Sequence, residues 1–167
     1  MKLPKLIITD IDGVWTDAGM YYDQQGNELK KFNTADSFGI ILCREFNIPV
    51  AIITGERTEI VSRRAEKLKI KHLYQGSSDK IKDATDLLIK LNIEWQDVAH
   101  IGDDLGDYHL LKKVGISGAP ANAADFIKEV SDIHTIKNGG DGAFREFVET
   151  IFKNAGVYEE ALERLLK

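Results

Sequence analysis

The sequence predicts an α/β protein with a doubly wound, Rossmann-like parallel sheet, an inserted β-hairpin and no cap domain. Three observations support this fold class. Short apolar runs of strand length alternate with helical patterns along nearly the whole chain, as in sheets whose parallel strands are joined by crossover helices. The alternation is broken once, by a hairpin-like segment at about residues 18–33. Acidic and polar residues follow several apolar runs, at the strand ends where open α/β sheets bind ligands.

Size and composition indicate one domain over residues 1–167. The chain has 167 residues, 43% hydrophobic and 29% charged, which is ordinary for a globular protein. The longest apolar runs, such as Val50 to Ile53, are too short to span a membrane, and the early first strand leaves no room for a signal peptide. The single cysteine excludes an internal disulfide framework, so we expect a cytoplasmic protein. A formal charge of −5, with basic residues spread along the chain, argues against nucleic acid as the partner.

The predicted elements follow one another in regular order. Buried parallel strands are expected at Lys5–Thr9, Pro49–Thr54, His72–Gln75, Val98–Gly102 and Gly115–Gly118. Helices are expected at Ser37–Phe46, Arg57–Leu68, Lys80–Leu91, Gly106–Val114, Ala123–Val130 and Gly142–Asn154, with an amphipathic tail at Tyr158–Leu166. Right-handed crossovers would place these helices on both faces of the sheet.

The segment between the first strand and the first helix predicts a β-hairpin. Gly19–Tyr22 and Glu28–Phe32 have strand character, and Gly26 and Asn27 between them tolerate positive φ. A hairpin that projects from the body exposes strand edges that need pairing or covering. A surface flap and association with another subunit are both open at this point.

Polar groups at three predicted strand ends and at one helix start would meet at one edge of the sheet. They are, in chain order, Asp10-Ile11-Asp12-Gly13, Thr54-Gly55-Glu56, Lys80, Gly102-Asp103-Asp104 and Asp107. Each group alone has a structural explanation, because Asp favours turns and helix caps and a lysine is usually solvated. Together they crowd carboxylates whose like charges repel. A divalent cation resolves that conflict, and Mg²⁺ suits a site with few carboxylates, several waters and a phosphate.

These groups resemble the motifs of the haloacid dehalogenase superfamily of phosphatases, over nearly the whole chain. Further segments resemble its small capless branch, which hydrolyses phosphates of 3-deoxy-2-ulosonic sugar acids: Lys31 to Asp36, His72 to Gly76 and Gly139 to Glu146. The resemblance implies a magnesium-dependent phosphoric monoester hydrolase with an aspartyl-phosphate intermediate. It makes Asp10 the nucleophile and Asp12 the acid that protonates the leaving oxygen and then activates water. Spacing alone does not choose between these two aspartates.

The resemblance also implies how metal and phosphate are held. Mg²⁺ would be bound by the side chains of Asp10 and Asp103 and by the backbone carbonyl of Asp12. Thr54 and Lys80 would bind the transferring phosphoryl oxygens. Further candidates for substrate binding are Gly13, where an absent Cβ lets a phosphate approach, and Gly55. Two acidic residues are expected to organise the site without ligating the metal: Asp104 and Asp107, the latter with helix capping as its alternative.

The chain has no room for a separate cap domain, because hairpin and helices occupy the stretches between the motifs. An open site would need cover, since water exclusion and positioning help catalysis. The resemblance implies a homotetramer in which the hairpin of one subunit covers the neighbouring site. The segment from Gly139 could also fold over the entrance, with Arg145 available for a carboxylate or, equally, salt-bridged on its helix.

The identity of the sugar acid depends on three residues after the second strand. Glu56, Arg64 and Lys67 resemble the type that acts on the nine-carbon 2-keto-3-deoxynonulosonate 9-phosphate (KDN 9-phosphate), the nonulosonate or sialic acid type. Glu56 could accept hydrogen bonds from sugar hydroxyls, and the two basic residues could hold a carboxylate. KDN 9-phosphate is therefore the preferred substrate. The alternative is 3-deoxy-D-manno-octulosonate 8-phosphate (KDO 8-phosphate) of lipopolysaccharide synthesis.

Two further readings remain beside the enzyme. A signalling receiver domain also combines aspartates, Mg²⁺, Thr and Lys, but its phospho-accepting Asp normally follows the third strand. A non-catalytic oligomerisation module could lose its nucleophile, whereas this chain keeps Asp10. The four histidines lack metal-ligand spacing and are expected in the core or on the surface: His72, His100, His109 and His134. Trp15 is expected to pack in the core.

Overall fold

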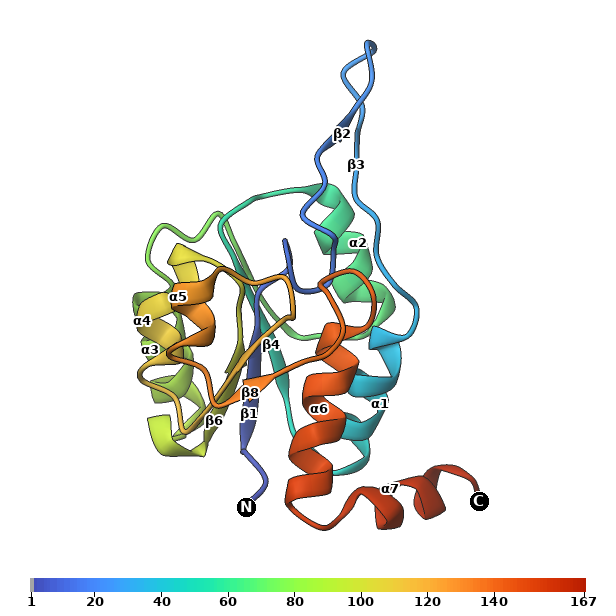
Figure 1. The fold of residues 1–167 in the computed structure, drawn as a ribbon, viewed down its shortest axis with the longest axis vertical. Helices are drawn as coiled ribbons and strands as arrows, with labels where there is room; N and C mark the ends of the chain where they lie inside the picture. The colour runs from blue at the N-terminus through green and yellow to red at the C-terminus, as the bar shows by residue number, and fades with distance from the viewer. Residues whose placement is uncertain (1) are drawn as a thin grey trace.

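The structure, a computed structural model, describes residues 2–167. A six-stranded sheet of parallel strands forms its centre (Figure 1). Across the sheet the strands lie in the order β5 (His72–Gln75), β4 (Val50–Thr54), β1 (Leu6–Thr9), β6 (Val98–Ile101), β7 (Ile116–Ala119) and β8 (Ile133–His134). Helices cover both faces, so the doubly wound α/β fold predicted from the sequence is confirmed.

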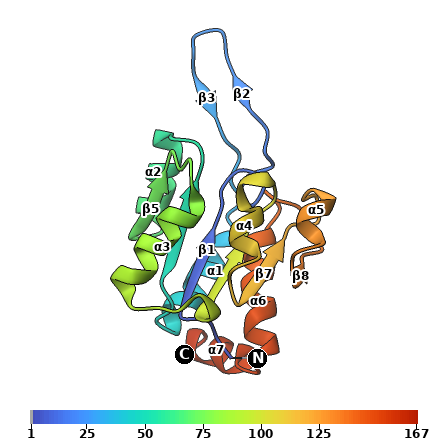
Figure 2. The ribbon, with the colours of Figure 1, turned by 90° about the vertical axis from the view of Figure 1, so that its left-hand side faces the viewer.

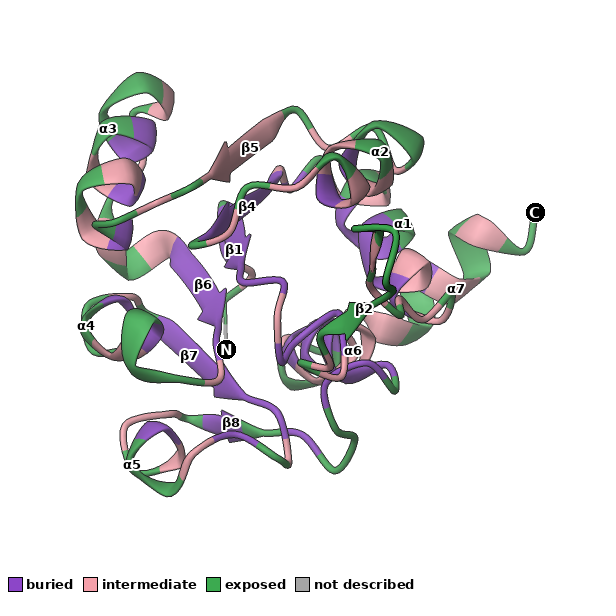
Figure 3. Cartoon of the chain, turned by 90° about the horizontal axis from the view of Figure 1, so that it is seen from above, coloured by how far each residue is buried: buried purple, intermediate pink, exposed green. Residues whose placement is uncertain are grey.

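The helices divide between the two faces of the sheet (Figures 1 and 3). One face carries α3 (Lys80–Leu91), α4 (Tyr108–Leu111) and α5 (Asp125–Lys128). The other carries α1 (Asp36–Glu45), α2 (Glu59–Lys67) and α6 (Ala143–Asn154), with α7 (Tyr158–Leu165) beside them. Two 3-10 helices precede β6 and α4, at Trp95–Asp97 and Leu105–Asp107.

The period of two along β1 explains why both faces are apolar. Leu6 and Ile8 belong to the cluster that includes Leu87 of α3, whereas Ile7 belongs to the cluster under α1 and α6. Alternate side chains of a strand point to opposite faces, so each helical layer is packed against its own set. The α6 side holds the largest buried aromatic rings, including Trp15, whose ring centroid lies 4.6 Å from that of Phe144. The predicted core position of Trp15 is therefore confirmed.

The strand order creates a crevice at the carboxyl ends of the central strands. From β1 the chain moves outward through β4 to β5, and then returns to the opposite side of β1 with β6, β7 and β8. Neighbouring connections leave in opposite directions at this point, which is where open α/β sheets bind ligands. The loops after β1, β4 and β6 meet there.

The inserted hairpin stands out beyond the carboxyl ends of the strands (Figure 2). It consists of β2 (Tyr21–Tyr22) and β3 (Glu28–Leu29), paired antiparallel, and a bridge between Thr16 and Phe32 at its base. At the tip, the Asp23 side chain accepts hydrogen bonds from the backbone N–H groups of Gln25 and Asn27. These hydrogen bonds within the turn stabilise the tip of the hairpin.

Some elements differ from the sequence-based expectation. The strand β8 was not predicted, because two residues are too short to show a period. The expected helix Gly106–Val114 is a 3-10 turn followed by one turn of α-helix, and the hairpin strands are shorter than expected. Within the described range, 2–167, the helices are all too short or too polar to span a membrane.

Candidate active site

Most of the predicted motif residues line one pocket at the carboxyl edge of the sheet, and Asp103 and Gly13 lie beside it. Its volume is about 310 Å³. Asp10 follows β1, Thr54 ends β4, Lys80 opens α3, and the Asp103 loop follows β6. The residues that line the pocket are Asp10, Asp12, Met20, Thr54, Gly55, Glu56, Ser77, Ser78, Lys80, Asp104, Gly106 and Asp107.

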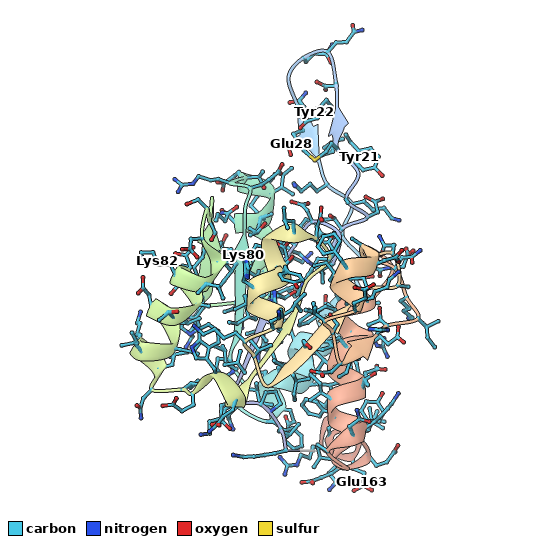
Figure 4. The ribbon with its side chains drawn as sticks, turned by 60° about the vertical axis from the view of Figure 1, so that its left-hand side comes forward. Tyr21, Tyr22, Glu28, Lys80, Lys82 and Glu163 are labelled. Carbon is cyan, nitrogen blue, oxygen red and sulfur yellow. The ribbon has the colours of Figure 1, made fainter. Side chains whose placement is uncertain are left out.

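Lys80 lies between two carboxylates inside the pocket. Its Nζ is 2.9 Å from Asp10 Oδ2 and 2.8 Å from Asp107 Oδ1. The Asp79 side chain accepts a hydrogen bond from the Lys82 N–H and so caps α3, which places Lys80 in its first turn. Figure 4 shows Lys80 inside the body, whereas Lys82 points outward from the same helix. Lys80 therefore both neutralises the Asp10 carboxylate and holds it in place.

Three carboxylates gather where a cation would bind. One oxygen each from Asp10, Asp103 and Asp107 lies within 4.8 Å of the others. Asp10 Oδ1 is buried and has no hydrogen-bond partner. Burial, with the neighbouring charges of Asp10 and Asp107, raises the pKa of Asp103 to about 8, and burial raises that of Asp10 as well. A buried carboxylate oxygen without a donor, among others of like charge, fits Mg²⁺.

Two glycines make this close approach possible. Gly13 has φ of +80°, and a Cβ placed on it would lie 1.9 Å from Asp103 Oδ2. A Cβ on Gly102 would lie 2.2 Å from Asp107 Cγ. The glycines of both acidic motifs are thus required by the packing of carboxylates against the backbone.

His100 supports the site from beneath, and the sequence did not reveal this role. Its ring is fully buried, with Nε2 3.0 Å from Asp107 Oδ1 and Nδ1 3.2 Å from the Ile8 carbonyl oxygen. Burial alone would raise the pKa of Asp107, but the contacts with His100 and Lys80 hold it below its ordinary value. The signal in the sequence was the position of His100 on β6, two residues before Gly102, which places its ring close to the acidic motif.

Asp12 is held by a lysine that the sequence analysis also missed. Lys30 Nζ lies 2.7 Å from each carboxylate oxygen of Asp12 and 2.6 Å from Glu56 Oε2. Burial alone would lower the pKa of Lys30, but hydrogen bonds to Asp12 and Glu56 raise it above its ordinary value. Lys30 is two residues before Phe32, which packs on the core. The period of two therefore placed Lys30 inward, and this signal was overlooked.

Besides Gly13, three residues expected to bind substrate do not line this pocket. Arg64 donates from Nη2 to the Asn33 carbonyl and the Ser37 hydroxyl. Lys67 is exposed in the last turn of α2. Arg145 Nε lies 2.6 Å from Glu149 Oε1, which matches the salt-bridged alternative.

The remaining predicted residues lie at or beside the pocket. Thr54 is buried at the end of β4, with Gly55 and Glu56 following it along the wall. Asp104 caps the next turn, its Oδ1 accepting a hydrogen bond from the Leu105 N–H at 2.7 Å. The organising role expected for Asp104 fits that cap.

The chain is similar to known phosphatases along most of its length. The haloacid dehalogenase-like hydrolase family matches residues 53–147. The 3-deoxy-D-manno-octulosonate 8-phosphate phosphatase KdsC of Salmonella typhi is 43% identical over 157 residues, which are 94% of this chain and 84% of that protein. KdsC of Yersinia pestis is 43% identical over 147 residues, 88% of this chain and 79% of the relative.

Solved structures show the same fold. A probable YrbI family phosphatase from Pseudomonas syringae pv. phaseolica has a TM-score of 0.94 at 42% identity, and the match covers 99% of this chain and 94% of that one. The 3-deoxy-D-manno-octulosonate 8-phosphate phosphatase of Moraxella catarrhalis, solved with magnesium ion, phosphate ion and KDO, has a TM-score of 0.93 at 36% identity. That match covers 97% of this chain and 93% of the other.

Proposed function

This chain belongs to the haloacid dehalogenase-like hydrolases, and from that premise we propose that it removes phosphate from a phosphorylated 3-deoxy-2-ulosonic sugar acid, with KDO 8-phosphate as the substrate. One observation carries the proposal. Asp10 presents one oxygen to Lys80 at 2.9 Å and keeps its other, buried oxygen without a donor, beside Asp103 and Asp107. A carboxylate held in this way suits nucleophilic attack on phosphorus in a metal-dependent site.

The reaction would proceed in two displacements. An Asp10 carboxylate oxygen forms a bond to phosphorus while the bond from phosphorus to the sugar oxygen breaks, and Asp12 gives its proton to that leaving oxygen. Water then attacks the aspartyl-phosphate, Asp12 takes a proton from the water, and the bond between Asp10 and phosphorus breaks to release inorganic phosphate. Lys80 and Thr54 would hold the phosphoryl oxygens from the pocket wall.

The acidic cluster is where the protein would hold Mg²⁺. Asp10 and Asp103 have side-chain oxygens in the cluster, and Asp12 could add its backbone carbonyl. When bound, Mg²⁺ supplies charge neutralisation for the phosphoryl group. Asp107 contacts Lys80 and His100, and would hold the side chains around the metal site in place.

The choice between the two sugar acids rests on the relatives and on the pocket. Relatives over 40% identical carry the name 3-deoxy-D-manno-octulosonate 8-phosphate phosphatase, which supports the eight-carbon substrate. KDN 9-phosphate was expected from Glu56, Arg64 and Lys67, and of these Glu56 alone lines the pocket. KDN 9-phosphate stays as the second candidate because Glu56 offers a hydroxyl acceptor at the mouth.

Phosphate release tests this proposal. KDO 8-phosphate, KDN 9-phosphate and simple hexose phosphates are compared at equal concentration with Mg²⁺ present. We expect kcat/KM to be highest for KDO 8-phosphate. A clear preference for KDN 9-phosphate would reverse the assignment and restore Glu56 as a specificity residue. No turnover of any of them would favour the non-catalytic oligomerisation module.

We also propose that the chain works as a homotetramer in which the hairpin covers a neighbouring site. The hairpin exposes four large apolar side chains: Met20, Tyr21, Tyr22 and Leu29. Tyr22 and Leu29 are 67% and 65% exposed, and Figure 4 shows both labelled tyrosines standing clear of the body. Apolar side chains gathered on a projecting element are typical of a protein interface, and a site without a cap domain lacks other cover.

A further inference from the structure

Lys30, at the base of an otherwise exposed hairpin, has a buried side chain. It follows β3 directly, and its side chain is 0% exposed, whereas that of the next residue, Lys31, is 57% exposed. Its ammonium lies 2.7 Å from both oxygens of Asp12, 2.6 Å from Glu56 Oε2 and 4.0 Å from Glu28 Oε1. Burying an ammonium is costly unless it is paired and hydrogen-bonded. The ion pairs with these carboxylates therefore hold the Lys30 ammonium in place.

This contact joins three parts of the molecule. Lys30 comes from the hairpin, Asp12 from the loop after β1, and Glu56 from the loop after β4. Both carboxylates line the pocket. Without a cation between them, the two negative charges would repel each other and an anionic substrate. Lys30 offsets part of that charge, as Lys80 does for Asp10 and Asp107.

The same contact fixes the orientation of Asp12. Both carboxylate oxygens accept from Lys30, and Oδ1 also accepts from the Thr16 hydroxyl at 3.1 Å. The Asp12 side chain is 27% exposed, so in the absence of Lys30 it would have solvent space to turn into. General acid catalysis requires the donor oxygen to lie within hydrogen-bond reach of the leaving oxygen.

We propose that Lys30 is a positioning residue for the leaving-group step: it holds the Asp12 side chain where the departing sugar oxygen is protonated, one carboxyl oxygen accepting from Lys30 while the other carries the proton. The inference rests on the proposed phosphatase function, and it adds a residue that comes from the hairpin. Lys30 acts through Asp12 and does not itself touch the reacting atoms. The base of the hairpin therefore supports catalysis within its own chain, and this role does not depend on what the tip of the hairpin contacts.

Leaving groups of different quality separate this role from a purely structural one. An alkoxide such as the sugar oxygen needs a proton as it leaves, whereas p-nitrophenolate leaves without one. The ratio of kcat/KM for KDO 8-phosphate to that for p-nitrophenyl phosphate therefore reports on proton delivery in the first displacement. We would measure it for the wild type, Lys30→Met, Lys30→Arg and the neighbouring exposed-lysine control, Lys31→Met.

We expect Lys30→Met to lower kcat/KM for KDO 8-phosphate by about tenfold or more, with a change of less than about threefold for p-nitrophenyl phosphate because the latter needs no acid. Lys30→Arg, which keeps a cation beside Asp12, should recover part of the loss. Lys31→Met should behave as the wild type.

Equal losses on both substrates in Lys30→Met, or no loss on either, would overturn the inference while leaving the phosphatase proposal intact. A wild-type protein that releases phosphate from neither substrate would instead refute the phosphatase proposal, and the role of Lys30 with it. Thermal midpoints of all variants identify a misfolded one. If Lys30→Met does not fold, Lys30→Gln replaces it under the same criteria.

Discussion

Gly13 and Gly26 both adopt a positive φ, +80° and +85°, but in different surroundings. A Cβ on Gly13 would lie 1.9 Å from Asp103 Oδ2, whereas one on Gly26 would meet nothing within 4 Å. Both Gly→Ala changes should cost about 1 kcal/mol in backbone strain. We predict that Gly13→Ala alone abolishes phosphate release, because Asp103 must move away from the cluster. Urea unfolding and activity measured on both variants check this, and an active Gly13→Ala protein would contradict it.

Asp36 is a buried carboxylate away from the metal cluster. Its Oδ1 accepts a hydrogen bond from the Arg145 N–H, its Oδ2 has no partner, and burial raises its pKa from 3.8 to about 6. A carboxyl whose folded pKa is raised destabilises the fold above that pKa, and the cost disappears below the unfolded value.

We therefore predict that Asp36→Asn is more stable than the wild type by about 1–3 kcal/mol at pH 7. The gain should shrink as the pH falls from about 6 to about 4, because both proteins then carry a neutral group at this position. Urea unfolding at several pH values measures the difference, in which other titrating groups cancel. A gain that is constant with pH would show that the Asp36 charge is not its cause.

At the scale of residues, the sequence predicted the residues that carry the chemistry better than the residues that hold them in place. The motif positions Asp10 and Thr54 could be placed from strand ends alone, and Lys80 from the start of a helix. Lys30 and His100 act through contacts across 18 and 7 residues of chain, and neither belongs to a motif. Such contacts depend on which faces meet in three dimensions, which a single sequence does not state.

At the scale of elements, the proposed assembly gives the hairpin a role beyond its own chain. Leu29 is 65% exposed on β3, so a charged side chain can be introduced there without disturbing the core. We predict that Leu29→Asp lowers the assembly from a tetramer to smaller species and reduces kcat/KM, because the neighbouring site loses its cover. Sedimentation and phosphate release measure both effects.

The exposed turn residue Gln25 offers a matched control, since Gln25→Asp adds the same charge near the tip. This variant should remain assembled. A fully active, monomeric wild-type protein would rule out the shared cover.

Element boundaries were predicted best where a buried strand runs into a motif. β1 and β4 each have every residue buried, which gave long apolar runs. The strand β8 has two residues, one of them exposed, and offers no period to read. The segment after Asp104 begins as a 3-10 turn because Asp104 caps it and Asp107 turns inward to Lys80. Local propensity toward one continuous helix was overridden by those contacts.

At the scale of the whole molecule, metal binding should couple to stability. Asp10, Asp103 and Asp107 lie within 4.8 Å of one another, and a cation that binds only the folded state stabilises it by mass action. We predict that Mg²⁺ at about a hundredfold excess over its dissociation constant raises the thermal midpoint by about 5 °C or more.

The rise should disappear in Asp103→Asn and persist in Asp86→Asn, a variant of an exposed carboxylate on α3. Thermal unfolding with and without Mg²⁺ provides the comparison. An equal shift in both variants would assign the metal effect to another place.

The order of apolar runs and helical patterns predicted the overall architecture, because a parallel sheet needs buried strands and crossover helices in alternation. The assembly was implied only by the family resemblance, because exposed apolar residues on a hairpin do not identify the surface that they contact. The fold therefore follows from the pattern of one chain, whereas the proposed cover of the site would require a second chain.

The nucleophilic role of Asp10 is the central claim, and phosphate release from KDO 8-phosphate by Asp10→Asn tests it most directly. The wild type and the exposed-carboxylate variant Asp86→Asn serve as references, each with Mg²⁺ and with a chelator. We predict release by both references with Mg²⁺, loss of release with the chelator, and background release by Asp10→Asn with an unchanged fold. Substantial release by Asp10→Asn would contradict the account and move the nucleophile elsewhere.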